Sequence, residues 1–274
     1  MKTPRFEKIL AATLITGALV IGASACASTD TAPSGTNDAS TTPASTTEAL
    51  EGSITVFAAA SLTKTFTALG AAFEEAHPGT HVTFSFAGSS DLVTQLTEGA
   101  PADVFASADE ANMAKVTTAD LASGAPIDFA TNVLTIAVPP GNPAKVTSFA
   151  DLASPDVKTV VCAPQVPCGT ATVKIEIATG VTLTPVSEES SVTDVLGKVS
   201  SGEADAGLVY VTDVTSAGAS VESVGLPEAS AAVNTYPITA LTGSSNGALA
   251  AAFVAFVMGP DGQKVLTIAG FGTP

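Results

Sequence analysis

Tryptophan is absent from this chain of 274 residues, and several other residue types are scarce. The sole arginine is Arg5, so the rest of the sequence has no guanidinium to clamp the carboxylate of an organic acid. The ten basic residues face 26 acidic ones, and the formal net charge is −16. Because a protein that binds nucleic acid needs a basic surface, this composition excludes nucleic acid as a partner.

Histidine and tyrosine each occur twice, as His77, His81, Tyr210 and Tyr236. A ferric-ion site needs tyrosine, histidine or carboxylate ligands, and a catalytic serine needs a neighbouring base. Both histidines fall near the end of the first predicted helix, away from the expected ligand cleft, and the sequence contains no G-K-[S/T] loop. The sequence therefore predicts a binding protein that is not an enzyme, with no cofactor and no side chain bound directly to a metal.

Residues 1–25 have the pattern of a signal peptide, with basic residues up to Lys8 followed by a small, apolar stretch. The segment Ala23-Ser-Ala-Cys26 is compatible with two kinds of processing. A lipoprotein signal would make Cys26 the lipidated N-terminus, although Ala23 stands where leucine is usual. Ordinary cleavage after Ala-x-Ala would give a secreted protein.

Residues 27–49 are almost all Ser, Thr, Ala, Pro, Asn, Gly and Asp, a composition that cannot bury a core. We therefore expect residues 26–52 to be a flexible tether that begins at a lipid-anchored Cys26. The chain would then be exported and held at the outer face of the cell membrane. Removing residues 1–25 leaves seven basic and 25 acidic residues, a formal charge of −18. An anion would thus have to be bound by local dipoles rather than by net charge.

The two remaining cysteines, Cys162 and Cys168, are close in sequence, and in an exported protein this spacing predicts a disulfide. A metal-binding pair and two free thiols are the alternatives. A metal is disfavoured because both histidines lie far away in the sequence and no second cysteine pair exists.

From residue 53 onward, strand and helix patterns alternate, which predicts an α/β fold with parallel-type sheets. Strands are predicted at 53–59, 81–86, 103–107, 132–138, 158–162, 182–186, 206–211, 220–224 and 236–241. Helices are predicted at 62–73, 90–98, 109–117, 147–153, 169–179, 191–201, 246–258 and 261–268. The chain is long for a single sheet of eight or more strands, so we expect two lobes with a ligand cleft between them. Residues 53–131 and 237–274 would form lobe 1, and residues 132–236 would form lobe 2.

Hydroxyl residues follow two neighbouring strands where a helix should begin. Ser61 and Ser89 stand at expected N-cap positions, and a helix start is a natural anion site because its N–H groups are unpaired. Similar turns occur at residues 167–169 and 190–192, and Tyr210 ends a buried strand. Four helix starts and a phenol could therefore converge on one cleft. The alternative is that the serines are ordinary N-caps and Tyr210 is a core residue.

Three stretches, 54–63, 86–92 and 99–109, resemble the molybdate-binding proteins of ABC uptake transporters. Their sequences are Ile54-Thr-Val-Phe-Ala-Ala-Ala-Ser-Leu-Thr, Phe86-Ala-Gly-Ser-Ser-Asp-Leu and Gly99-Ala-Pro-Ala-Asp-Val-Phe-Ala-Ser-Ala-Asp. The resemblance covers residues 53–274. It implies a two-lobed periplasmic-binding-protein fold of type II, which closes on a tetrahedral oxyanion. The expected ligand is molybdate or tungstate, the expected partner is an ABC permease, and the chain is expected to be a monomer.

The resemblance also assigns the ligand contacts. They are the hydroxyl and N–H groups of Ser61 and Ser89, the N–H groups of Cys168 and Val192, and the hydroxyl of Tyr210. The chain departs from the family at Cys168, where alanine is usual, and at Gly88, where serine is frequent and where we expect a looser turn. A site made only of donors disfavours protonated phosphate, whose O–H needs an acceptor. A protein of the same fold for another small anion, such as sulfate, remains the alternative.

Overall fold

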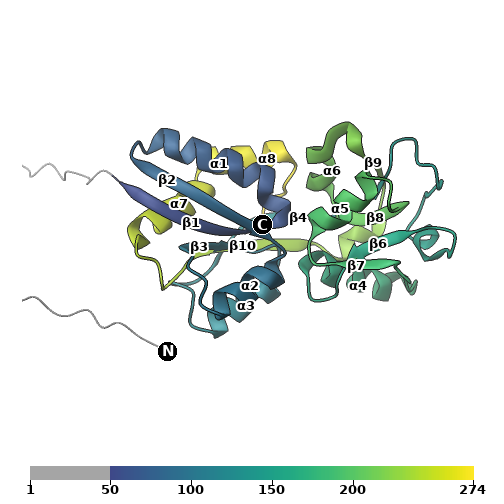
Figure 1. Ribbon diagram of the computed structural model, residues 1–274, viewed down its shortest axis with the longest axis horizontal. Helices are drawn as coiled ribbons and strands as arrows, with labels where there is room; N and C mark the ends of the chain where they lie inside the picture. Colours follow the sequence, from purple (N-terminus) through teal and green to yellow (C-terminus); the bar gives the residue numbers. More distant parts are fainter. Residues whose placement is uncertain (1–49) are drawn as a thin grey trace, which may run out of the picture. The chain divides into compact units, whose positions relative to one another are not determined.

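The computed structural model describes residues 50–274, which form two five-stranded sheets flanked by helices (Figure 1). The predicted signal peptide, the lipidation site at Cys26 and the tether up to residue 49 lie outside the described residues. Among residues 50–274, no single helix is long and apolar enough to cross a membrane. One pair of helices, bent by 57°, would satisfy that test together by length and composition only.

The first sheet has the strand order β2-β1-β3-β10-β4. Its strands are β1 (Gly52–Ala59), β2 (Thr80–Ala87), β3 (Val104–Ala106), β4 (Ile127–Asn132) and β10 (Asn234–Ala240). β1 is parallel to β2 and β3, whereas β10 is antiparallel to β3 and β4. The return strand begins at Asn234, before the lobe boundary at 237 that the sequence suggests.

The second sheet has the order β7-β6-β8-β5-β9. Its strands are β5 (Leu134–Val138), β6 (Thr159–Cys162), β7 (Ser187–Glu189), β8 (Ala206–Tyr210) and β9 (Glu222–Val224). β6 is parallel to β7 and β8, and β5 is antiparallel to β8 and β9. The two sheets therefore have the same arrangement: three neighbouring parallel strands lie next to a strand that is antiparallel to them.

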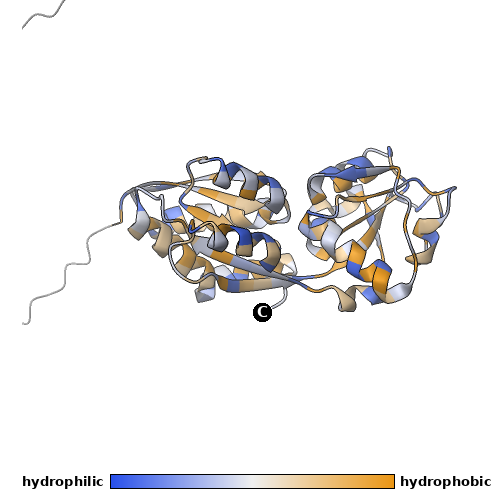
Figure 2. Cartoon of the chain, turned by 90° about the horizontal axis from the view of Figure 1, so that it is seen from below, coloured by the Kyte–Doolittle hydropathy of each residue, from blue (hydrophilic) through white to orange (hydrophobic). Residues whose placement is uncertain are grey.

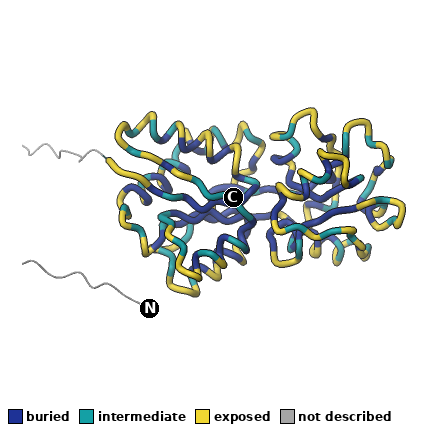
Figure 3. The backbone as a smooth tube through the Cα atoms, viewed as in Figure 1, coloured by how far each residue is buried: buried dark blue, intermediate teal, exposed yellow. Residues whose placement is uncertain are grey.

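Helices connect the strands and cover the sheets. The α-helices are α1 (Thr63–Ala76), α2 (Ser89–Thr97), α3 (Glu110–Thr118), α4 (Pro167–Thr179), α5 (Val192–Ser200), α6 (Val211–Ala217), α7 (Gly247–Met258) and α8 (Pro260–Ala269). Short 3-10 helices are η1 (Ala60–Leu62), η2 (Ala150–Ala153), η3 (Gly218–Ser220) and η4 (Pro227–Ala231). The apolar residues lie mainly on the strands and on the helix faces that cover them, and the exposed backbone lies mainly on outer helices and loops (Figures 2 and 3).

The cores beneath the two sheets differ in character. The first is aromatic, because four fully buried rings contact one another in a row: Phe129, Phe66, Phe253 and Phe73. Ring centroids are 5.6 Å apart for Phe66 and Phe129 and 5.3 Å apart for Phe73 and Phe253. Such tilted and edge-to-face pairs add stability beyond the apolar area that they bury. The second core consists mostly of Val, Leu, Ile and Ala, and the first-lobe residue Ala60 packs into it.

Several predicted elements need correction. The strand predicted at 132–138 is two strands that break at Val133, because β4 pairs in the first sheet and β5 in the second. No strand spans residues 182–186, where β7 instead begins at Ser187, and the helix predicted at 147–153 is the 3-10 helix η2. The short helix α6, which follows β8 directly, is not anticipated by the sequence pattern.

Candidate anion-binding site

A small cavity lies where the carboxyl ends of strands from both sheets meet. All five residues that the sequence analysis assigns to the ligand line it: Ser61, Ser89, Cys168, Val192 and Tyr210. The other lining residues are small or apolar: Ala59, Ala60, Gly88, Ala108, Val166 and Pro167. The free space inside it is about 10 Å³, close to what one water molecule needs. None of the lining residues is charged.

Ser61 does not cap a helix, contrary to the prediction. It lies within the 3-10 helix η1, and the cap position of α1 is held by Leu62 without a side-chain hydrogen bond. The Ser61 Oγ is instead 3.1 Å from the hydroxyl oxygen of Tyr236, which reaches it from β10. The short 3-10 turn thus places a half-buried hydroxyl at the cavity and connects it to the first core.

Ser89 also differs from the prediction, because Gly88 holds the cap position and Ser89 is the first residue of α2. Its buried Oγ accepts a hydrogen bond of 3.0 Å from the N–H of Ala108. The first hydrogen bonds to the Gly88 carbonyl come from Asp91 and Leu92, so the N–H of Ser89 precedes the helical ladder. Ser89 therefore offers the cavity a backbone donor and a hydroxyl whose oxygen is already engaged.

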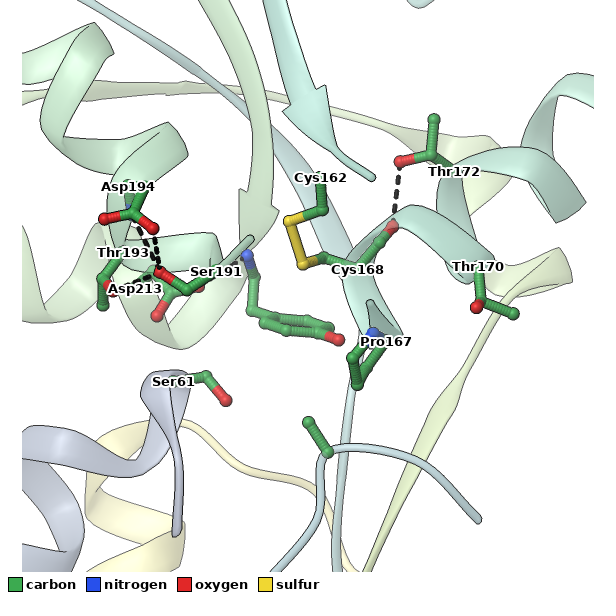
Figure 4. Close-up of a disulfide and its surroundings, with 12 residues drawn as sticks. Ser61, Cys162, Pro167, Cys168, Thr170, Thr172, Ser191, Thr193, Asp194 and Asp213 are labelled. Carbon is green, nitrogen blue, oxygen red and sulfur yellow. Dashed lines mark hydrogen bonds between the residues drawn. A yellow bond between two sulfur atoms is a disulfide. The ribbon is translucent and has the colours of Figure 1, made fainter. Parts of the chain in front are cut away.

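Helix α4 begins at the cavity with Pro167, which suits the first helical position because it has no N–H. Cys162 and Cys168 form the predicted disulfide, with their Cα atoms 5.6 Å apart (Figure 4). The first bond of the helix runs from Thr170 N to Val166 O, at 2.9 Å, and leaves the N–H of Cys168 free of the helical ladder. The disulfide therefore joins this donor covalently to the end of β6.

Helix α5, which follows strand β7 of the second sheet, also begins at the cavity. Ser191 is its N-cap, and the Ser191 Oγ accepts a hydrogen bond of 3.2 Å from the N–H of Asp194 (Figure 4). The Ser191 hydroxyl also donates to the Asp194 carboxylate at 2.7 Å. Val192, the first residue of the helix, is 3 % exposed and lies against the cavity. Its N–H precedes the first helical bond, which Val195 donates to the Ser191 carbonyl.

Tyr210 is the last residue of β8 and is 1 % exposed. Its hydroxyl oxygen is buried and has no hydrogen-bond partner among the described residues. An unpaired buried hydroxyl costs free energy, so a ligand that accepts from it gains correspondingly. Burial raises the pKa of Tyr210 well above its usual value, and the nearby Tyr236 and the carboxylates of Asp109 and Asp213 act in the same direction. The phenol therefore keeps its proton and remains a donor.

Gly88 allows the two halves of the site to approach closely. A Cβ atom at this position would lie 2.1 Å from the carbonyl oxygen of Ser190, which belongs to the turn before α5. Any residue other than glycine would push this turn away from α2. In this chain the glycine therefore permits close packing across the cavity, in place of the looser turn expected from the sequence.

Three further residues around the cavity are not identified by the sequence pattern. Tyr236 contacts Ser61, and Asn234 donates a hydrogen bond of 2.9 Å to the Ala108 carbonyl and a long one of 3.5 Å to the Pro167 carbonyl. Asp213, in the first turn of α6, accepts a hydrogen bond of 2.8 Å from the N–H of Tyr210. Tyr236 and Asn234 come from the return strand β10, so only their partners, distant in sequence, identify them.

The arrangement lacks what a metal site or a hydrolytic site would need. No group of three or more His, Cys, Asp or Glu side chains within residues 50–274 could hold a metal ion. Residues 243–247 have the G-x-S-x-G spacing of a nucleophile elbow, but Ser245 is exposed, outside the cavity, and makes no side-chain hydrogen bond to a histidine in the described chain. The cavity offers hydroxyl and N–H donors, which is the chemistry of a small anion.

Comparison with known proteins identifies relatives of this chain. The family of bacterial extracellular solute-binding proteins matches residues 54–272. The molybdate-binding protein ModA of Mycobacterium tuberculosis is 55% identical over 222 residues, which are 81% of this chain and 85% of that protein.

Two solved structures share the fold over 81% of this chain. The periplasmic molybdate-binding protein of Azotobacter vinelandii matches over 99% of its own chain, with a TM-score of 0.68 and 24% identity. The sulfate-binding protein SubI of M. tuberculosis matches over 86% of its chain, with a TM-score of 0.71 and 21% identity. At such identities the structures establish the fold alone, and the predicted α/β fold of periplasmic-binding-protein type is confirmed.

Asp213 generates a testable pH dependence of stability. Burial raises its pKa from 3.8 to about 7, so between these values the folded chain holds a proton that the unfolded chain has lost. Rising pH therefore favours unfolding over this range, by at most about 1.4 kcal/mol per pH unit, and the effect ends above about pH 7. Asp213→Asn keeps an acceptor for Tyr210 N–H and lacks this titration. In urea denaturation at several pH values, the stability of wild type relative to the variant should fall from about pH 4 to pH 7. A constant difference would contradict the raised pKa.

Proposed function

The chain belongs to the family of bacterial extracellular solute-binding proteins, and we propose that it captures molybdate, and tungstate with it, for delivery to an ABC permease. The family binds solutes and does not transform them, so the prediction that the chain is not an enzyme is confirmed. The proposal for molybdate is supported by the relative from M. tuberculosis, which is 55% identical and is named as a molybdate-binding protein.

The observation that carries the proposal is a cavity lined by neutral donors from both sheets and by no charged side chain. A tetrahedral dianion accepts charge-assisted hydrogen bonds, each contributing about 1.5–3 kcal/mol net. Several such bonds, together with the partial positive charge at helix starts, offset the cost of removing the anion from water. The Tyr210 hydroxyl, buried and unpaired, gains a partner when the anion binds.

Sulfate is the second candidate, because the sulfate-binding protein SubI shares the fold at a TM-score of 0.71. Sulfate has the same charge and shape as molybdate and is smaller, so hydrogen-bond donors alone do not separate the two ions. The size of the cavity decides between them. We favour molybdate because the relative of that name is much more similar in sequence than the sulfate-binding structure, at 55% against 21% identity.

Selectivity among oxyanions tests the proposed function. We expect one molybdate or tungstate to bind each chain, which acts as a monomer, with similar affinity for the two ions and far weaker binding of sulfate and phosphate. Calorimetric titration of the purified protein with the four anions measures this directly, and bound ligand should also raise the melting temperature. If sulfate at equal concentration raised the melting temperature as much as molybdate, sulfate would become the better assignment.

Replacement of Tyr210 by phenylalanine tests the role of its hydroxyl. The change removes one hydrogen bond to a charged ligand, so molybdate affinity should fall by about 10- to 150-fold, or 1.5–3 kcal/mol. Because the hydroxyl has no partner within the described residues, the unliganded variant should melt no lower than the wild type. An unchanged affinity would instead identify Tyr210 as a core residue without a ligand contact.

The N-terminal segment suggests how the chain is held at the membrane. We propose that Cys26 carries a lipid that holds the chain at the outer face of the cell membrane, with residues 26–52 as a tether; the composition of this segment supports it. The intact mass of protein purified from membranes should then correspond to a chain that begins at Cys26 and carries acyl groups. A mass that fits an unmodified chain cleaved after Ala25 would favour plain secretion.

A further inference from the structure

Both serine hydroxyls at the cavity have an internal partner. The Ser89 Oγ accepts from the N–H of Ala108 at 3.0 Å, and a backbone N–H can only donate. The Ser61 Oγ is 3.1 Å from the Tyr236 hydroxyl, and in this pair either oxygen can be the donor. The direction of the second hydrogen bond decides whether Ser61 resembles Ser89 in its behaviour toward a ligand.

The surroundings of Tyr236 favour the phenol as the donor. Tyr236 is fully buried, and its hydroxyl lies 3.1 Å from the Ser61 Oγ, with the side chains of Asn132 and Tyr210 also close to it. If Ser61 donated to Tyr236, the Ser61 proton would be unavailable to the anion, which is the stronger acceptor. Burial raises the pKa of Tyr236, so the phenol retains its proton. When Ser61 donates its proton to the ligand, its contact with Tyr236 can be a hydrogen bond only with Tyr236 as the donor.

The ring of Tyr236 is held firmly in this position. It packs edge-to-face on Tyr210, Phe129 and Phe271, with centroid distances of 5.9, 6.2 and 5.5 Å. These contacts involve the ring and not the hydroxyl, so phenylalanine can keep them. The hydroxyl can therefore be removed without a cavity in the core, and Ser61 is the partner directly affected.

We propose that Tyr236 is a specificity-determining residue that makes Ser61 a donor only, and this proposal rests on the proposed function of the site. Tyr236 does not touch the ligand. It engages the Ser61 oxygen, as Ala108 engages that of Ser89, and thereby removes an acceptor from the cavity.

The ligand class that this arrangement rejects is the protonated oxyanion. Molybdate, tungstate and sulfate are dianions without an O–H near neutral pH, so a site made of donors satisfies them completely. Phosphate near neutral pH carries at least one O–H, which must find an acceptor when it is buried. No carboxylate lines the cavity, and the oxygens of Ser61 and Ser89 are already engaged, which leaves the Tyr210 hydroxyl as the side-chain oxygen of the lining without a partner among the described residues. Loss of the Tyr236 hydroxyl would free the Ser61 oxygen to accept from phosphate.

Tyr236→Phe tests the proposal through the ratio of the affinity for molybdate to the affinity for phosphate, and not through either affinity alone. In calorimetric competition titrations, the variant should lose affinity for molybdate and sulfate while phosphate affinity stays constant or rises. The preference for molybdate over phosphate should narrow by about tenfold, the factor that one neutral hydrogen bond provides. Thermal melting without ligand shows whether the variant is folded.

Two control variants separate this role from general damage to the site. Tyr210→Phe also removes one phenolic hydroxyl, but one that donates to the ligand, so it should weaken the binding of all the anions without narrowing the preference for molybdate over phosphate. In a Ser61→Ala background, Tyr236→Phe should no longer alter the ratio, because the oxygen that it frees is absent.

A measurement on the unaltered protein gives an independent result. In molybdate-bound wild type, NMR should find the Tyr236 hydroxyl proton slowly exchanging and directed at Ser61. A phenolic proton directed elsewhere would overturn the proposal, even if Tyr236→Phe failed to fold.

The outcomes also separate this proposal from the proposed function. If the wild type prefers molybdate and Tyr236→Phe lowers all affinities by one factor, Tyr236 has a structural role and the specificity proposal fails alone. The same holds if the ratio narrows equally in the Ser61→Ala background. A wild type that binds no oxyanion would overturn both proposals.

Discussion

Backbone N–H groups that have no acceptor in their own helix are the constraint on which the site depends. At the starts of α2, α4 and α5, such groups face one cavity, and each would lose free energy if buried there without a partner. Small or apolar neighbours such as Ala59, Ala108 and Pro167 leave these donors accessible. These donors thus have no acceptor within their own helices, and an anion can supply one without any lysine or arginine.

Three side-chain hydroxyl groups also face the cavity as donors, and the surroundings of each are different. A backbone amide engages the oxygen of Ser89, a buried phenol lies against that of Ser61, and the hydroxyl of Tyr210 has no internal partner. Both tyrosines of the chain therefore lie at or directly behind the site, one as a donor and one as a support. In a chain with so few aromatic polar groups, this concentration ties them to the site rather than to general packing.

Local patterns predicted the parts of the structure that depend on neighbouring residues. The alternation of strand and helix and the disulfide were confirmed, and so was the resemblance to molybdate-binding proteins. Parts that depend on contacts distant in sequence were not predictable. The hydrogen bond from Tyr236 to Ser61 joins residues 175 positions apart, and the approach of Gly88 to Ser190 crosses between the two sheets. The break at Val133 was missed because one apolar run supplies strands to two different sheets.

The position of β10 has a consequence for how this chain matures. β10 lies between β3 and β4, and β4 has no other neighbour in the first sheet. During synthesis and export from the N-terminus, the first sheet therefore remains in two pieces until residues 234–240 emerge, whereas the second sheet, from β5 to β9, is complete earlier. The aromatic core also awaits Phe253 from α7. The strands of the second sheet are therefore all available before those of the first, and the ligand site needs both.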